Sequence, residues 1–335
     1  MKVLALLEDL EGASARLRLL PFLGWLEARG ARVTAITLPS SGPARWRVLA
    51  RAAEYDSVVL QRRLLKPWES VLLGVRARRL VVELDDALWR RDRPPFESAW
   101  RRLEARCLWR AADVVVAGSP SLARELASLG VDAVVVPTPV VAESASEEGA
   151  APPSAAPPVV AWIGQPATWR YAAPRIDRWV SVASSGRARL VVMGAPEETQ
   201  ESLREAGIDG RRWTPEGELA LLREAAIGLA PLDDDPWTRG KCGARHLRFL
   251  AAGVPVIASA VGEQADLAAE FGGTRLVQPG GDWAEPLLEL VQNAAERHRL
   301  GLGLAKRVAA VRRLDAVAVQ FEALVRGVAG APGGR

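Results

Sequence analysis

Histidine and cysteine are scarce in this chain of 335 residues, which has two of each. His246 and His298 are too few for a histidine-rich metal site, and a Ser-His-Asp triad would have to use one of them. Cys107 and Cys242 lie far apart and form no C-x-x-C pattern, which argues against a disulfide scaffold or a structural zinc site. This composition fits a reducing, cytoplasmic setting.

Long apolar runs are also missing. The first apolar run, residues 3–7, ends at Glu8 and Asp9, whereas the apolar region of a signal peptide needs about 7–15 residues. No run approaches the ~18 apolar residues of a membrane span. We therefore expect a cytoplasmic protein whose membrane contact, if it has any, is peripheral at the inner face. The lack of a leader argues against a periplasmic solute-binding protein.

The composition is that of a globular protein, with 49% hydrophobic and 25% charged residues. The length fits two domains of about 100–200 residues each. A net charge of +4 allows an anionic ligand, but it lacks the clustered basic tail of a nucleic-acid-binding arm. We expect no nucleic-acid partner.

One segment, residues 143–158 (ESASEEGAAPPSAAPP), is rich in small residues and proline and is typical of a linker. We therefore expect an N-terminal domain over 1–142 and a C-terminal domain over 159–335. Short apolar strands alternate with helical patterns in both halves, which predicts parallel sheets covered on both faces. The expected fold class is α/β, with two doubly wound, Rossmann-like domains facing a cleft and ligands beyond the carboxyl ends of the strands.

The expected strands are 2–7, 32–38, 57–61, 79–84, 113–117, 133–136, 159–163, 189–193, 227–232, 254–259 and 275–277. The expected helices include 15–29, 96–109, 176–184, 215–224, 243–252 and a long helical stretch over 283–328.

The stretch PLDDDPWTRGKCGARHLRFLAAGVPVIAS, residues 231–259, joins a predicted strand to a predicted helix. Arg239 and Lys241 precede the helix, and Gly243 allows a close backbone approach at its N-terminus, which favours anions. These features predict a phosphate-binding loop; the alternative is a solvated loop whose acids and bases pair. The aspartates 233–235 could form a D-x-D metal site, but Asp before Pro favours turn chemistry, and we expect no metal.

A second glycine turn follows the strand over 159–163, in VVAWIGQPATWRY. After Gly164, the side chains of Gln165, Thr168 and Arg170 can donate hydrogen bonds to an anion. Because this turn and the first one leave the same sheet edge, both could converge on one diphosphate. Trp213 could stack on a nucleobase or could equally pack against its own sheet.

In the first half, Ser14 and Arg16 follow the first strand, and Asp85 and Asp86 end another. The first pair could face a ligand, or Ser14 could simply cap a helix that carries surface arginines. The aspartates could bind sugar hydroxyls or act as a base, or cap the following turn.

The stretches quoted above, together with GASARLRLLPFLGWLEARGARVTAITL, VVLQRRLL and VVELDDALW, resemble glycosyltransferases of the GT-B fold, retaining family-4 type, in a bacterial branch. The resemblance covers nearly the whole chain and is most specific from Lys241 to Val256. It implies two Rossmann-like domains and a nucleotide-diphospho-sugar donor.

The resemblance also implies a set of site residues. Those near the donor would be Gly164, Gln165, Thr168, Arg170, Arg239, Lys241, Gly243, Glu263 and Gln264, and those on the acceptor side Arg16, Asp85 and Asp86. Apart from the resemblance, we also expect Trp213 and Cys242 near the donor and Ser14 on the acceptor side. The chain departs from the family at Arg248, where a glutamate that bonds the ribose is common, and at Gly240, where the paired glutamate would stand. The common histidine of the N-terminal domain is also absent.

We therefore expect metal-independent transfer of a sugar from a UDP- or GDP-linked donor to an acceptor hydroxyl, with retention of configuration and no cofactor. Lys241, Arg239 and Arg170 would stabilise the charge on the leaving diphosphate, and Asp85 or Asp86 would orient the acceptor. The acceptor could be a carbohydrate, a lipid-linked molecule or a small molecule. The alternatives are a nucleotide-sugar epimerase or phosphorylase on the same framework, or a non-catalytic binding or scaffold subunit with a degenerate site.

Overall fold

The computed structural model describes residues 1–140, 156–184 and 186–328. Within these residues the chain divides into two compact units. Unit 1 comprises Met1–Pro139, Asp235–Cys242 and the segment from Arg312 onward; unit 2 comprises Val140–Asp234 and Gly243–Val311. The predicted linker, 143–158, lies almost entirely outside the described residues.

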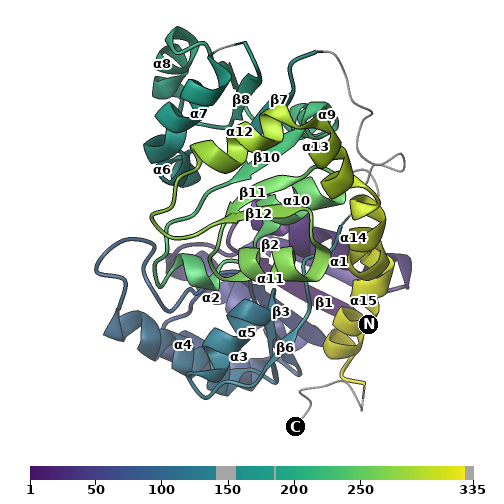
Figure 1. Cartoon of the computed structure of the whole chain (residues 1–335). Coiled ribbons are helices and arrows are strands. Elements are labelled where there is room, and N and C mark those ends of the chain that lie inside the picture. Colours follow the sequence, from purple (N-terminus) through teal and green to yellow (C-terminus); the bar gives the residue numbers. More distant parts are fainter. Residues whose placement is uncertain (141–155, 185, 329–335) are drawn as a thin grey trace. The chain divides into compact units, whose positions relative to one another are not determined.

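Unit 1 contains a parallel sheet of six strands in the order β2-β1-β3-β4-β5-β6. Figure 1 labels β1, β2, β3 and β6 of this sheet. The strands are β1 (Lys2–Leu7), β2 (Arg32–Thr37), β3 (Ser57–Gln61), β4 (Leu80–Leu84), β5 (Val114–Ala117) and β6 (Ala133–Val135). The helices are the π-helical turn η1 (Ala15–Leu19), α1 (Leu20–Ala28), α2 (Gly42–Ala50), η2 (Arg51–Glu54), α3 (Pro67–Arg76), α4 (Ala99–Ala111), α5 (Pro120–Ala127), η7 (Thr238–Gly240) and α15 (Leu314–Arg326).

Helices cover both faces of this sheet, which explains why β3, β4 and β5 bury every residue. Leu49, Leu73 and Leu108 of α2, α3 and α4 pack in one core with alternate strand residues. Phe22 of α1 and Phe321 of α15 pack in the core on the other face, with the intervening strand residues.

The C-terminal helix α15 corrects the predicted domain division, which assigned 159–335 to a single C-terminal domain. Phe321 stacks on Phe22 with ring centroids 4.7 Å apart, and the Ser57 hydroxyl donates to the carbonyl of Val325 at 2.6 Å. The apolar stripe of α15 is therefore buried against α1 and β3, and the helix belongs to unit 1. The linker composition indicates where the chain leaves unit 1 for the first time. No similar composition precedes α15, so the sequence does not indicate that the chain ends in unit 1.

Unit 2 contains a second parallel sheet of six strands, in the order β12-β11-β10-β7-β8-β9. The strands are β7 (Val159–Ile163), β8 (Arg189–Met193), β9 (Asp209–Arg211), β10 (Ile227–Ala230), β11 (Val256–Ser259) and β12 (Thr274–Val277). The helices are η4 (Pro166–Thr168), α6 (Trp169–Ala172), η5 (Ala173–Arg175), α7 (Ile176–Ala183), η6 (Glu197–Thr199), α8 (Gln200–Glu205), α9 (Pro215–Glu224), α10 (Ala244–Ala251), α11 (Glu263–Phe271), α12 (Ala284–Gln292), α13 (Ala294–Gly301) and α14 (Leu304–Arg312).

Both strand orders confirm the predicted doubly wound α/β class. The order reverses between β1 and β3 in unit 1 and between β7 and β10 in unit 2. Open parallel sheets of this kind bind ligands outside the carboxyl ends of the strands at such a switch point. The loops that follow these four strands are therefore the first places to look for function.

The predicted strands are all present, with bounds that differ by at most two residues. The strand β9 was not predicted, because its sequence Asp-Gly-Arg has no apolar residue. The predicted long helical stretch over 283–328 is divided among α12, α13, α14 and α15. None of the helices among the described residues has the length and apolar character needed to cross a membrane.

Candidate active site

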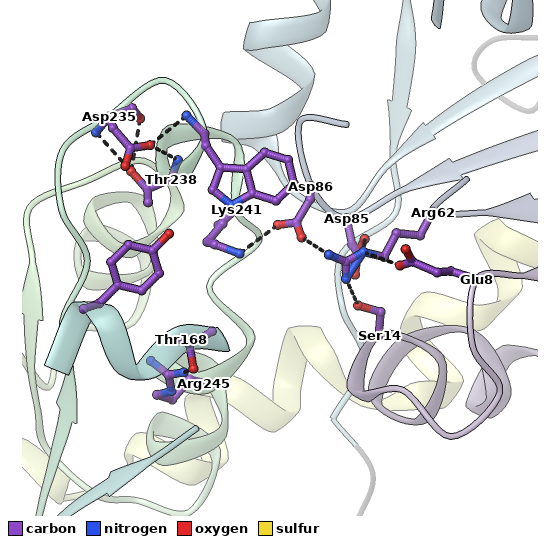
Figure 2. Close-up of polar contacts among 12 residues, drawn as sticks. Glu8, Ser14, Arg62, Asp85, Asp86, Thr168, Asp235, Thr238, Lys241 and Arg245 are labelled. Carbon is purple, nitrogen blue, oxygen red and sulfur yellow. Dashed lines mark hydrogen bonds and ion pairs between the residues drawn. The ribbon is translucent and has the colours of Figure 1, made fainter. Parts of the chain in front are cut away.

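Arg62 is the centre of a charged cluster at the switch point of unit 1 (Figure 2). It follows β3, and its guanidinium pairs with Asp86 at 2.7 Å and Glu8 at 3.2 Å, with Asp85 at 3.6 Å. It also donates to the hydroxyl of Ser14 at 2.9 Å. The carboxyl ends of β1, β3 and β4 supply these groups, so the parallel sheet itself brings them together.

The backbone and electrostatics of this cluster are unusual. Arg62 has a φ of 52°, a left-handed conformation that is uncommon outside glycine and often found at functional sites. Burial works against its charge, but the carboxylates of Asp85, Asp86 and Glu8 outweigh it and raise the pKa of Arg62. Burial raises the pKa of Asp86, opposed by the positive charges of Lys241 and Arg62.

Lys241 belongs to this cluster, because its ammonium group lies 3.3 Å from Asp86 and 5.3 Å from the centroid of the Trp237 ring. The segment that carries it packs on unit 1. Trp237 is buried in the core of that unit, Arg90 donates to the carbonyl of Pro236 at 2.6 Å, and Ser121 donates to the carbonyl of Arg239 at 3.1 Å. The predicted C-terminal domain, 159–335, included this whole segment, but residues 235–242 belong to unit 1.

The three consecutive aspartates, residues 233–235, have different surroundings. Asp235 accepts from the backbone N–H groups of Trp237 and Thr238, both at 2.8 Å, which is the turn chemistry expected from the sequence. Asp233 pairs with Arg175 at 2.8 Å in unit 2. Asp234 is exposed.

Cys242 and Arg18 are buried inside unit 1. The thiol of Cys242 lies against Gly118 and Ser119, and burial raises its pKa. Arg18 forms a fully buried ion pair with Glu83 and donates to the carbonyl of Val136 at 2.7 Å. A ligand-binding role for Cys242 was expected from its place in the loop, but its sulfur faces the interior of unit 1.

Ser14 and Arg16, the predicted acceptor-side residues, separate in the structure. Ser14 joins the Arg62 cluster, whereas Arg16 donates through Nε to the carbonyl of Glu11 at 2.9 Å. Arg239, predicted to act on the leaving phosphate, has an exposed side chain.

Unit 2 gathers a second group of polar side chains at its switch point between β7 and β10. Arg245, in the first turn of α10, donates to the hydroxyl of Thr168 at 2.8 Å and lies 5.0 Å from the centroid of the Trp162 ring. Burial lowers the pKa of Arg245 to about 10, and the negative charge of Glu218 offsets this only in part. This cation therefore lies beside the turn after β7, where an anion would be stabilised.

The backbone of this edge is shaped by glycine. A β-carbon on Gly164 would lie 2.3 Å from the Trp162 indole, and Gly243 has a φ of 62° with its α-carbon facing Glu263 and Leu267. Gly243 is the N-cap of α10 and supplies no side-chain cap, so the first N–H groups of the helix, next to Arg245, have no intrahelical partner. Glu263 lies at the start of α11 beside this point.

Of the other predicted donor-site residues, two are closely held by their neighbours. Gln264 is buried, donates to the carbonyl of Ala230 at 3.0 Å, and leaves its Oε1 without a hydrogen-bond partner. Arg170 donates to the Tyr171 hydroxyl at 2.7 Å, while Gln165 is exposed.

Arg248 has a partner that the sequence did not suggest. Its guanidinium lies 2.7 Å from Glu218 of α9, which also accepts from the indole N–H of Trp213 at 2.7 Å. Trp213, which could stack on a base or pack against its own sheet, is oriented by this hydrogen bond to Glu218.

Sequence reasoning missed Arg62, Glu8 and Glu218. A signal existed for Arg62 and Glu8, because each follows a predicted strand directly. Glu218 lies within a helix, and its contact with Arg248 depends on how α9 packs beside α10.

Comparisons with known proteins bear on the fold. No protein-family profile and no curated protein matches the chain. Among solved structures, sucrose-phosphate synthase from Thermosynechococcus elongatus is 17% identical with a TM-score of 0.74, over 98% of this chain and 99% of its own. HepE of Anabaena, solved in complex with UDP and glucose, is 15% identical with a TM-score of 0.74, over 98% and 100% of the two chains.

Two further structures widen the comparison. WaaG, a glycosyltransferase involved in lipopolysaccharide biosynthesis, is 13% identical with a TM-score of 0.72, over 98% and 100% of the two chains. A putative UDP-N-acetylglucosamine 2-epimerase from Listeria monocytogenes is 13% identical with a TM-score of 0.61, over 97% and 96%. At these identities the likeness shows the fold alone: the chain has the GT-B fold of two Rossmann-like domains.

Proposed function

We propose that the protein is a glycosyltransferase that moves a sugar from a nucleotide-diphospho-sugar to an acceptor hydroxyl, with retention of configuration and without a metal. The observation that carries the proposal is the group at the switch point of unit 2. There Arg245, Thr168 and the N-terminus of α10 present a cation, a hydroxyl and backbone N–H groups at one sheet edge.

The chemical demand of this reaction fits these groups. The bond between the anomeric carbon and the diphosphate breaks, and negative charge grows on the leaving phosphate oxygen. Arg245 and the N–H groups of α10 would stabilise that charge without a metal, and Lys241 and Arg239 keep the same predicted role. The acceptor oxygen forms the new bond, and its proton passes to the leaving phosphate, so no covalent nucleophile is required.

The cluster around Arg62 suits the acceptor. Asp85 and Asp86 can accept hydrogen bonds from a hydroxyl, and Ser14 can donate or accept one. Arg62 holds these groups in place. A carbohydrate, a lipid-linked molecule or a small molecule with hydroxyl groups would meet this requirement.

The nucleotide in the proposal is UDP or GDP. The titles of three HepE structures name UDP, UDP with glucose, and UDP-glucose, and HepE shares this fold over its whole length. UDP-glucose is therefore the first donor to test.

The test is a thermal-shift screen of UDP, GDP and their sugars, followed by measurement of nucleotide release with and without candidate acceptors. A bound donor raises the apparent stability by mass action. Arg245→Ala should abolish the shift, whereas Arg178→Ala, at an exposed arginine of α7, should preserve it. Equal shifts in both variants would exclude Arg245 from the donor site.

A second candidate, a non-catalytic nucleotide-sugar-binding subunit, is favoured by the Arg248–Glu218 pair. Arg248 stands where the resemblance implies a glutamate that bonds the ribose, and its guanidinium is already paired with Glu218. Donor binding without hydrolysis or transfer would support this candidate. Interconversion of two free nucleotide-sugars would instead identify an epimerase.

A further inference from the structure

Three helices of unit 1 expose an unusual number of large apolar side chains. We call this set the tryptophan face: Trp46 of α2, Trp68, Val71 and Val75 of α3, and Trp100 and Leu103 of α4. The three indoles are 48%, 46% and 57% exposed, and Val75 is 77% exposed. Contiguous apolar surface of this kind usually marks an interaction site, whereas isolated exposed apolar residues need no explanation.

The residues of the tryptophan face are grouped by one ring contact and by their spacing along the helices. The rings of Trp46 and Trp68 stack with centroids 5.5 Å apart, which joins α2 to α3. Trp68, Val71 and Val75 are spaced by three and four residues, so they form one stripe along α3. Trp100 and Leu103 have the same three-residue spacing on α4.

The three helices lie on the same face of the sheet. Their inner residues Leu49, Leu73 and Leu108 pack in a single core, so their outer sides point away from it together. The platform is tightly joined: Arg45 of α2 binds both carboxylate oxygens of Glu69 of α3, at 2.6 and 2.7 Å.

The contact between α3 and α4 is just as close. A β-carbon on Gly74 of α3 would lie 2.9 Å from the β-carbon of Ala111 of α4. The tryptophan face is therefore a preformed surface on rigid elements.

The three helices that carry the tryptophan face are mainly basic. The sequences of α2, α3 and α4 contain seven arginines and two glutamates: Arg45, Arg47, Arg76, Arg101, Arg102, Arg106 and Arg110 against Glu69 and Glu104. Neither glutamate is an exposed acid. Glu69 is buried in its pair with Arg45, and Glu104 is half-buried and hydrogen-bonded by Trp100. Arg47, Arg76 and Arg106 are exposed.

We propose that the tryptophan face docks on the surface of a phospholipid bilayer that contains anionic lipids. Indole rings favour the boundary between headgroups and acyl chains, because one part of the ring is apolar and its N–H is polar. Arginines around them attract anionic headgroups and can keep their charge in the headgroup layer while their stems cover apolar surface. This charge complementarity distinguishes a bilayer from a neutral apolar partner. The inference does not depend on the proposed sugar transfer.

The test is flotation of the full chain with vesicles of phosphatidylcholine alone and of phosphatidylcholine mixed with phosphatidylglycerol. We expect binding to the mixed vesicles, little binding to the neutral ones, and weaker binding at high salt, because salt screens the headgroup charge. Failure of the wild-type chain to bind the mixed vesicles, or equal binding to both, would overturn the proposal.

Variants locate the surface. Replacing Trp46, Trp68 and Trp100 together by serine should weaken binding at least about tenfold, on the scale of about 1.4 kcal/mol. Replacing Arg47, Arg76 and Arg106 by glutamate should remove the preference for anionic vesicles while the indoles remain. Leu302, Val311 and Val319 are also exposed but lie outside the tryptophan face. A matched control that replaces these three residues by serine should bind like wild type.

Circular dichroism and thermal melting of each variant show whether it is folded. The arginine variants leave the apolar residues untouched, so they keep the test decisive if the serine variant does not fold. Sedimentation velocity in the absence of lipid measures whether the chain forms dimers, which tests whether a second copy of the chain covers the tryptophan face. A wild-type dimer that the serine substitutions dissociate, with no vesicle binding, would assign the face to self-association and reject the bilayer.

Discussion

Replacing His246 by glutamine removes a buried group whose effect on stability depends on pH. His246 lies in α10 with no exposed surface; its Nε2 is 2.8 Å from the Thr274 hydroxyl, and its Nδ1 has no hydrogen-bond partner. Burial lowers its pKa from 6.5 to about 3, because protonation would place an unpaired charge in the core.

The sign and size of the effect follow from the two pKa values. Between about pH 6.5 and about pH 3 the unfolded chain binds a proton at this histidine and the folded chain does not, so stability falls as the pH falls through this window. One pKa unit corresponds to about 1.36 kcal/mol. Wild type should therefore lose about 2 kcal/mol through His246 between about pH 7 and about pH 5.

Urea unfolding of wild type, His246→Gln and His298→Gln at these two pH values measures the effect. The three proteins have the same carboxylates, so the difference between wild type and variant isolates one histidine. The stability of wild type relative to His246→Gln should fall by about 2 kcal/mol on acidification, while His298→Gln, at an exposed residue of α13, follows wild type. A pH-independent difference at His246 would refute the reasoning.

Three other substitutions test the site and the fold. Lys241→Ala should lower kcat/KM by the equivalent of about 2.7–4 kcal/mol in a transfer assay, the scale for losing one donor to a developing anion, and an unchanged rate would remove Lys241 from the mechanism. Arg18→Met should lower the free energy of unfolding in urea by about 3–5 kcal/mol, because it leaves the buried Glu83 carboxylate without its partner. The double variant with Glu83→Leu should recover most of that loss. Phe321→Ala should cost about 3–5 kcal/mol in the same assay, and a loss below about 1 kcal/mol would contradict the docking of α15 on α1.

The sequence was sufficient for the fold class because buried parallel strands carry a strong local pattern. Strands such as β3 and β4 are continuous apolar runs, and the helices between them show helical periodicity. The strand β9 and the docking of α15 were not readable. The first has no apolar residue, and the second depends on a contact between Phe22 and Phe321, which are remote in the sequence.

The candidate site was readable where strand ends supply it. Ser14, Asp85 and Asp86 were predicted from their positions after strands, and the structure brings them to one arginine. That arginine, Arg62, also follows a strand, but its left-handed backbone leaves no signature in the sequence. Arg248 was noticed only as a departure from a family pattern, and its partner Glu218 required the packing of two helices.

The loop from Asp235 to Cys242 shows why local pattern alone does not assign a segment to a domain. Its basic residues and its place before a helix predicted a phosphate-binding loop belonging to the C-terminal half. Gly240 instead packs against Ala87 of unit 1, and a β-carbon added to Gly240 would lie only 2.5 Å from the Ala87 side chain. Lys241 and Arg62 both pair with the Asp86 carboxylate. A lysine already paired must exchange that carboxylate for a phosphate before it can stabilise a leaving group. The strength of the Lys241–Asp86 pair therefore sets how much of the lysine's charge is available to a donor, and Asp86→Asn should release it.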